Sequence, residues 1–94
     1  MIPLERIKAI SANDPNPLLA SVLKLQEEVG EVAAAALATY GFQNRSASAT
    51  PNIEEELVDV IIVACDLLHK LNATNEQIET LFNTKLDKWV MKLS

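Results

Sequence analysis

The feature that most constrains the fold is a long apolar run near the middle of the chain, from Leu57 to Leu71. Apolar residues fall on almost every side of a helix drawn through this run, which is typical of a helix surrounded by protein. Its longest apolar part, Leu57 to Leu68, is interrupted by Asp59 and Asp66 and is too short to span a bilayer. We expect a single domain over residues 1–94, too small to cover this helix on all sides, and therefore an assembly with a second copy.

Two helices are predicted before the apolar run. Residues 3–12 favour a short helix, which ends at a proline-rich break. A longer helix is expected from about Pro17 to Tyr40, with Asn16 as its N-cap and Gly41 just past its end. Its apolar side chains recur at alternating spacings of four and three, a seam suited to a helical bundle. The seam consists of Leu18, Val22, Leu25, Val29, Val32 and Ala36.

Two more helices complete the prediction. The helix that contains the apolar run begins between Thr50 and Asn52, after a polar connection that starts at Phe42. Thr74 and Gln77 have the spacing of a capping box, which opens a fourth helix over residues 75–93. No segment shows a strand pattern. We therefore predict an all-α, four-helix chain that forms a bundle-type dimer or tetramer.

Composition excludes several classes of protein. A net charge of −5 disfavours binding to DNA or RNA, because phosphate contacts need clustered Lys and Arg. The N-terminus mixes charges into its first apolar residues and has no signal-peptide core. The single Cys65 cannot form an internal disulfide, so a reducing cytosol is the default. We expect a soluble cytoplasmic protein that binds neither a nucleic acid polymer nor a membrane.

Two pairs of carboxylates are the candidate functional groups. Glu28 with Glu31, and Glu56 with Asp59, are three residues apart, which puts each pair on one face of a helix. Like charges this close repel unless a proton or a cation lies between them. Asp59 also belongs to the apolar run, where an unpaired carboxylate is costly to bury. Carboxylate ligands favour Mg²⁺, Mn²⁺ or Ca²⁺, and Mg²⁺ commonly binds substrate phosphates as well.

The two acidic stretches also resemble a known signature. The sequence EEVGE at residues 27–31, followed by ELVD at residues 56–59, is similar to the EExxE…ExxD pattern of the MazG-like all-α nucleoside triphosphate pyrophosphatases. The lead-in KLQ at residues 24–26 looks like that family too, and the resemblance covers roughly residues 16–88. It implies an obligate dimer, often paired into a tetramer, that hydrolyses a nucleoside triphosphate to monophosphate and pyrophosphate.

The resemblance also implies roles for individual residues. The ligands of Mg²⁺, or of Mn²⁺ in its place, would be Glu28, Glu31, Glu56 and Asp59. The general base would be Glu27 or Glu28. The lysines that are candidates for contacting substrate phosphates are Lys24, Lys85 and Lys88. On the last helix Lys85 fits the family pattern, whereas Trp89 stands where Asn is frequent and Lys92 where Arg is frequent.

The leading hypothesis is a Mg²⁺-dependent hydrolase of a deoxynucleoside or non-canonical nucleoside triphosphate. The alternative is a non-catalytic helical interaction module, whose carboxylates bind a basic partner or a structural cation. Asp66 and His69 have the carboxylate-x-x-His spacing of a di-iron bundle, but we favour His69 as a helix-terminal residue near the negative end of the dipole. Asp66 can also extend the acidic site. Phe82 and Trp89 are expected in the core or in an interface.

Overall fold

The computed structural model describes residues 1–41 and 52–94, and within these ranges the chain is helical and contains no strand. The four helices are α1 (Leu4–Ala12), α2 (Leu18–Thr39), α3 (Ile53–Lys70) and α4 (Asn75–Leu93). Their bounds agree closely with the sequence prediction, so the all-α, four-helix chain is confirmed. Apart from Asn52, the predicted polar connection between α2 and α3 lies outside the described residues.

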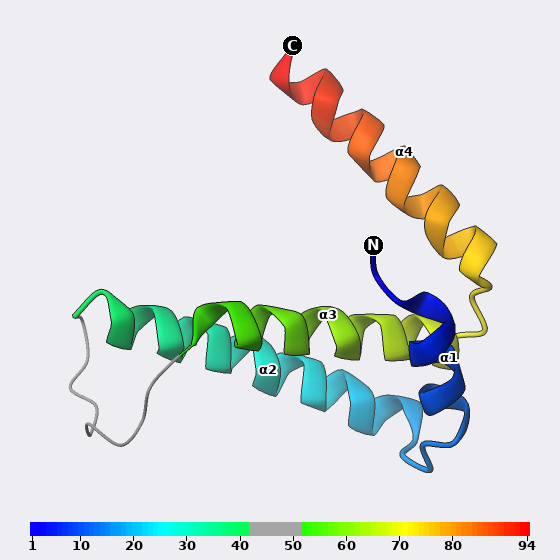
Figure 1. Ribbon diagram of the computed structural model, residues 1–94, viewed down its shortest axis with the longest axis horizontal. Helices are drawn as coiled ribbons and strands as arrows, with labels where there is room; N and C mark the ends of the chain where they lie inside the picture. Colours follow the sequence, from blue (N-terminus) through cyan, green and yellow to red (C-terminus); the bar gives the residue numbers. More distant parts are fainter. Residues whose placement is uncertain (42–51) are drawn as a thin grey trace.

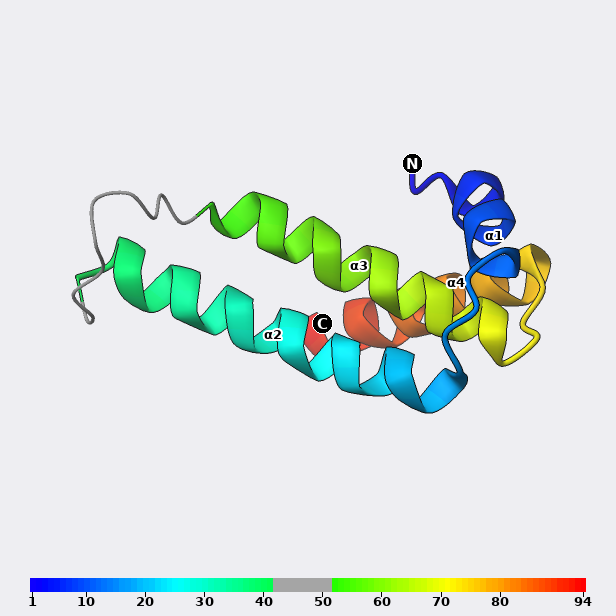
Figure 2. The same cartoon turned by 90° about the horizontal axis from the view of Figure 1, so that it is seen from below.

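The helices form a pair with two attachments. Helices α2 and α3 lie side by side along most of their length, and α1 packs on the C-terminal part of α3 (Figures 1 and 2). Helix α4 leaves the end of α3 after a short turn and projects away from the α2–α3 pair (Figure 1). No helix in the described ranges is both long enough and apolar enough to cross a membrane.

Local sequence accounts for most of the helix ends. The Asn52 side chain accepts a hydrogen bond from the backbone N–H of Glu55 at 3.0 Å, which caps α3. Thr74 and Gln77 form the expected capping box of α4, with side chain-to-backbone distances of 3.1 and 2.8 Å. Gly41 follows the end of α2 with φ +79°, a left-handed conformation that glycine adopts without strain. The predictions of the capping box and of Gly41 are confirmed, and the Asn52 cap lies within the range predicted for the start of α3.

The predicted N-cap of α2 is wrong. The helix begins at Leu18 after Pro17, and no side chain caps it. Asn16 instead donates its backbone N–H and its Nδ2 to Asp14 Oδ1, at 3.1 and 2.9 Å. The Asn16 side chain therefore donates to the Asp14 carboxylate and accepts no hydrogen bond from the first turn of α2.

The core of a single chain is small. The buried apolar side chains are Ile7, Ala35, Val63, Cys65, Leu67 and Ile78. Cys65 is 2% exposed, and burial raises the pKa of its thiol, as expected for a core residue. One side of α3 is about half exposed in the described part of the chain, with exposed fractions of 43–52% at Leu57, Val58, Ile61 and Ile62.

Only part of the predicted α2 seam is covered: Leu25, Val32 and Ala36 are partly buried, and the other three residues of the seam are exposed. Val22 and Val29 are 45% and 51% exposed, whereas Ser21 and Ala35 are 4% and 3% exposed. The neighbouring row, which runs from Ser21 through Glu28 to Ala35, therefore faces α3. Because this row carries an acid, α2 brings Glu28 directly to α3 and leaves much of its apolar seam on the outside.

Candidate metal centre

Three of the predicted ligands come together between α2 and α3. Glu28 from α2, with Glu56 and Asp59 from α3, each offer one carboxylate oxygen, and these oxygens lie within 4.8 Å of one another. Glu28 and Glu56 are partly buried and Asp59 is exposed. We call these three residues the acidic cluster. Their convergence follows from the row of α2 that faces α3 and from the three-residue spacing on α3.

Glu31 lies outside the acidic cluster but acts on it. The pKa of the Glu56 carboxyl is raised, first by burial and then by the negative charges of Glu31, Asp59 and Glu28. The Glu31 charge is the largest of these electrostatic causes. All four predicted metal ligands therefore contribute to one negatively charged region around Glu56.

The donor set of the acidic cluster fits a hard divalent cation. Mg²⁺ binds oxygen ligands at about 2.1 Å, so two opposite ligands lie about 4.2 Å apart. Oxygens spread over at most 4.8 Å need only side-chain adjustment to reach that separation. A bound cation also offsets the repulsion that raises the pKa of Glu56. Carboxylate oxygens alone favour Mg²⁺, Mn²⁺ or Ca²⁺ over zinc.

Our sequence-based prediction that Asp59 is buried is wrong for the single chain. The apolar run around Asp59 suggested protein on every side, but α2 covers only one side of α3. Asp59 lies at the open edge of this contact and is exposed. Asp59 is therefore assigned to the acidic cluster because its carboxylate lies close to those of Glu28 and Glu56. The cost of burying an unpaired carboxylate is no argument for this assignment, since Asp59 is exposed.

The other predicted site residues lie at different distances from the acidic cluster. Lys24 Nζ is 3.6 Å from Glu28 Oε1, one helical turn earlier on α2, and its side chain is 60% exposed. Glu27 is exposed on α2 and is outside the group of converging carboxylates. Lys85 and Lys88 are exposed on α4, which leads away from the α2–α3 pair (Figure 1). A single chain thus brings one of the three predicted lysines to the site.

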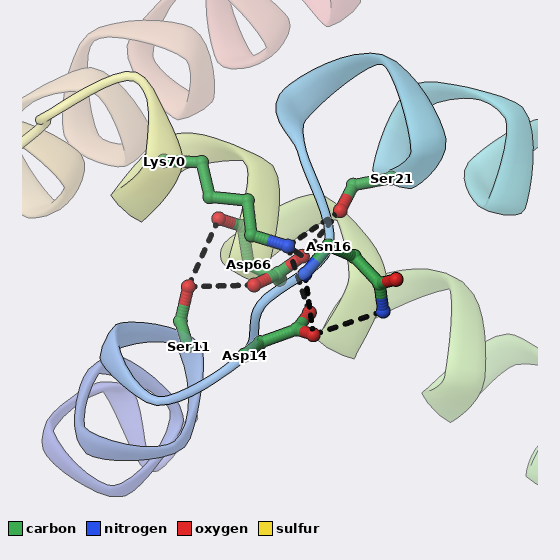
Figure 3. A network of polar contacts seen from close by, with 6 residues as sticks. All are labelled: Ser11, Asp14, Asn16, Ser21, Asp66 and Lys70. Atoms are coloured by element: carbon green, nitrogen blue, oxygen red, sulfur yellow. Dashed lines mark hydrogen bonds and ion pairs between the residues drawn. The ribbon is translucent and has the colours of Figure 1, made fainter.

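A second polar group on α3 was not predicted from the sequence. Asp66 accepts hydrogen bonds from Ser11 Oγ at 2.6 Å and from Ser21 Oγ at 3.0 Å (Figure 3). Lys70 Nζ lies 3.1 Å from Asp66 Oδ2. Lys70 Nζ also donates to Asp14 Oδ2 at 2.8 Å and to Ser21 Oγ at 2.7 Å. We call these five residues the Asp66 network. It ties α1, α2 and α3 together at the end of the molecule where α1 packs.

The Asp66 network shifts the pKa values of its members toward the charged forms. Burial alone would raise the pKa of Asp66, but hydrogen bonds from Ser11, Lys70 and Ser21 outweigh it and lower the pKa. The hydrogen bond from Lys70 is the main cause of the lowered pKa of Asp14, and the same bond raises the pKa of Lys70. Asp66 therefore has its own cationic partner and is not free to extend the acidic cluster.

The di-iron arrangement does not fit these contacts. Asp66 is held by two serines and a lysine, and its carboxylate has no free side for iron. His69 lies in the last turn of α3, as predicted for a helix-terminal residue. Its ring nitrogens are buried, and neither has a hydrogen-bond partner in the parts of the chain that the structure describes. Phe82 and Trp89 are exposed on α4, so they are not core residues of the single chain, and their predicted place in an interface stays a prediction.

Comparisons of the chain with protein-family models, with curated protein sequences and with solved structures found no match. The resemblance to the MazG-like pyrophosphatases therefore stays a prediction, based on the two acidic stretches. The acidic cluster itself concentrates negative charge between two helices. A cation bound there would reverse the sign of the local charge, so that a negatively charged phosphate group could bind.

Proposed function

We propose that this chain is a Mg²⁺-dependent nucleoside triphosphate pyrophosphohydrolase that acts as a dimer or a tetramer. Its substrate would be a deoxynucleoside or non-canonical nucleoside triphosphate, cleaved between the α and β phosphates to monophosphate and pyrophosphate. The observation that supports this proposal is the convergence of Glu28, Glu56 and Asp59 from two helices onto one point. The raised pKa of Glu56 supports it as well, because burial and four nearby carboxylates disfavour its negative charge, which a bound cation would stabilise.

The residues of the chain would divide the work as follows. Glu28, Glu56 and Asp59 hold the cation, and Glu31 completes or balances the coordination from α2. When bound, Mg²⁺ neutralises phosphate charge and lowers the pKa of a water molecule. Lys24, beside Glu28 at the rim, can turn its exposed ammonium group to a phosphate oxygen. Either Glu28 or the exposed Glu27 accepts the proton of the attacking water.

Pyrophosphate release from a panel of triphosphates in the presence of Mg²⁺ tests the proposal. The variants are Glu56→Gln and Asp59→Asn, which remove a charge and keep the shape of the side chain. Glu54→Gln is the matched control, since Glu54 is an exposed acid in the first turn of the same helix and lies outside the acidic cluster. Activity should be lost in the first two variants and retained in the control. Equal turnover in all four proteins would show that the assigned chemistry is wrong.

A non-catalytic interaction module is the second candidate function. The observation that favours it is the amount of apolar surface on the single chain, including Leu19 and Leu23 at 74% and 70% exposed. Patches of this kind mark surfaces that bind other proteins. Calorimetry with Mg²⁺ and a non-hydrolysable triphosphate separates the two functions. Binding that requires Glu56 favours the hydrolase, and the absence of nucleotide binding favours the module.

A further inference from the structure

Helix α4 is buried at its start and exposed along the rest of its length. Ile78, in the first turn, is 1% exposed, whereas the apolar residues further along the helix are 42–75% exposed. These exposed residues are Leu81, Phe82, Leu86, Trp89, Val90 and Leu93. A helix of 19 residues gains little stability from its backbone alone in water, and most helices in proteins depend on packing of an apolar face. The face of α4 beyond Ile78 therefore needs a cover.

The start of α4 fixes the direction of the helix. Ile78 is buried, the capping box closes the first turn, and the Asn75 side chain donates a hydrogen bond to Glu5 on α1. The turn before α4 is short and contains Asn72 with φ +66°. These contacts direct α4 away from the α2–α3 pair (Figure 1). Within residues 1–41 and 52–94, the contacts of α4 leave its apolar face beyond Ile78 largely exposed, and a second molecule can cover it.

The same chain has an apolar groove of about 1040 Å³. Residues of the N-terminal segment and of α1 form one side of it, residues of α3 form the other, and the first turns of α2 complete the lining. The main apolar lining residues are Ile2, Ile7, Ile10, Val58, Ile61 and Ile62. Ile61 and Ile62 are 43% and 45% exposed, so the groove is open to a large apolar partner.

We propose that α4 of a second copy of this chain lies in the groove between α1 and α3, and that the two copies exchange their α4 helices reciprocally. Each copy has an apolar helix face without cover and an apolar groove. In a two-fold dimer, α4 of each copy fills the groove of the other, so both apolar surfaces are covered. Two such contacts, each covering about six large apolar side chains, bury roughly 1,200–2,000 Å², the size of a stable interface. The inference deepens the dimer of the proposed function and does not depend on hydrolysis.

The groove adjoins the acidic cluster. Lys24 and Val58 belong to its lining, Lys24 pairs with Glu28, and Val58 precedes Asp59. A helix seated in the groove therefore lies beside the carboxylates. This position gives the lysines of α4, Lys85 and Lys88, a route to the site of the other copy that they do not have in their own chain.

Sedimentation equilibrium of the full chain tests the exchange through two single substitutions and a control. Trp89→Asp places a charge on the apolar face of α4, and Ile10→Asp places one in the groove, where Ile10 is 61% exposed and not needed for the fold of one chain. Asn83→Asp adds the same charge to an exposed position of α4 without removing an apolar side chain. Circular dichroism checks that each variant keeps its helices.

The exchange predicts a dimer whose dissociation constant rises by about tenfold or more in both Trp89→Asp and Ile10→Asp and changes little in Asn83→Asp. Trp89 is the only tryptophan of the chain, so its emission in the unmodified protein should shift to longer wavelength as dilution separates the copies. A monomer at all concentrations overturns the proposal. So does a dimer that only the α4 substitution weakens, or that neither substitution weakens, because the copies then meet elsewhere. Loss of pyrophosphate release with the dimer intact bears on the proposed function alone.

Discussion

Two groups of carboxylates on α3 differ in how their charges are balanced. Asp66 accepts two hydrogen bonds from serines and lies 3.1 Å from Lys70. Glu56, nearly three helical turns earlier, has Glu28, Glu31 and Asp59 around it and is left with a raised pKa, caused by burial and by these charges. The same helix therefore carries one carboxylate whose pKa is lowered and one whose pKa is raised.

This difference separates a structural acid from a candidate ligand. The charged and polar groups of the Asp66 network are paired with one another, so the network stabilises the packing of α1, α2 and α3. The acidic cluster is incomplete within the chain, because it has several negative charges and one lysine at its rim. Carboxylates with a perturbed pKa and no partner mark functional sites more often than satisfied ones do.

The largest expected effect is on activity. Glu56→Gln should lower pyrophosphate release by about a hundredfold or more, because it removes a ligand charge from the centre of the acidic cluster. Without metal, the same variant should unfold at a temperature no lower than that of the unmodified chain, since the substitution relieves repulsion. Steady-state assays and thermal unfolding in EDTA measure the two quantities. A variant that is both active and less stable would make Glu56 a structural residue like Asp66.

The opposite result is expected for Asp66. Asp66→Ala leaves Lys70 and two serines without their shared acceptor, which should lower the free energy of unfolding by about 2–3 kcal/mol. Ser21→Ala removes one hydrogen bond of the network and should cost about 1 kcal/mol. Chemical denaturation measures both, with Glu55→Ala on the same helix as the exposed control. If Asp66→Ala were as stable as this control, the two groups of acids would not differ in the way described.

Metal removal should affect the two groups differently. At ten times its dissociation constant, Mg²⁺ should stabilise the unmodified chain by about 1.4 kcal/mol through binding to the folded state alone. The stabilisation should persist in Ser21→Ala and vanish in Glu56→Gln. Thermal unfolding with Mg²⁺ and with EDTA measures it. Equal stabilisation of Glu56→Gln would place the cation elsewhere.

The smallest effect is the pH dependence of stability, which should have opposite signs for the two carboxylates. The pKa of Asp66 is lowered by its hydrogen bonds, so its contribution is full above the ordinary carboxyl pKa and is lost as the pH falls through the lowered value. The pKa of Glu56 is raised, so its charge costs stability at neutral pH, and this cost disappears as the pH falls through the raised value.

Denaturation of Asp66→Asn and Glu56→Gln, from about pH 7 to about pH 4, measures this dependence. Asp66→Asn should be less stable than the parent at neutral pH and Glu56→Gln should be more stable. Both differences should shrink toward the acidic end. Differences of the same sign would contradict the opposite pKa shifts.

The sequence predicted those features that depend on neighbours along the chain. The capping box at Thr74 and the turn at Gly41 involve residues no more than a few positions apart, and both are present. The all-α fold and the helix bounds follow from the same local signals. The two three-residue spacings also predicted which acids share a face, and Glu28 does meet Glu56 and Asp59.

Features that depend on distant partners were missed. Ser11 and Asp66 are 55 positions apart, and nothing in either local sequence pairs them. Asp66 and Lys70 do have an i,i+4 spacing, which could have indicated an ion pair. Which of two neighbouring rows of α2 faces α3 depends on how closely α3 approaches. The regular apolar seam therefore did not predict that the row through Ser21, Glu28 and Ala35 faces α3. The exposure of Asp59 follows from the same long-range geometry.

Binding of Mn²⁺, followed by electron paramagnetic resonance, tests the central claim most directly, because it needs neither the substrate nor turnover. The unmodified chain, Glu56→Gln and the control Glu54→Gln would each be titrated. We predict that the first and third bind Mn²⁺ with the same affinity, that added Mg²⁺ displaces the ion, and that Glu56→Gln loses the binding. Unchanged binding by Glu56→Gln, or none by any of the three proteins, would contradict a cation site formed by Glu28, Glu56 and Asp59.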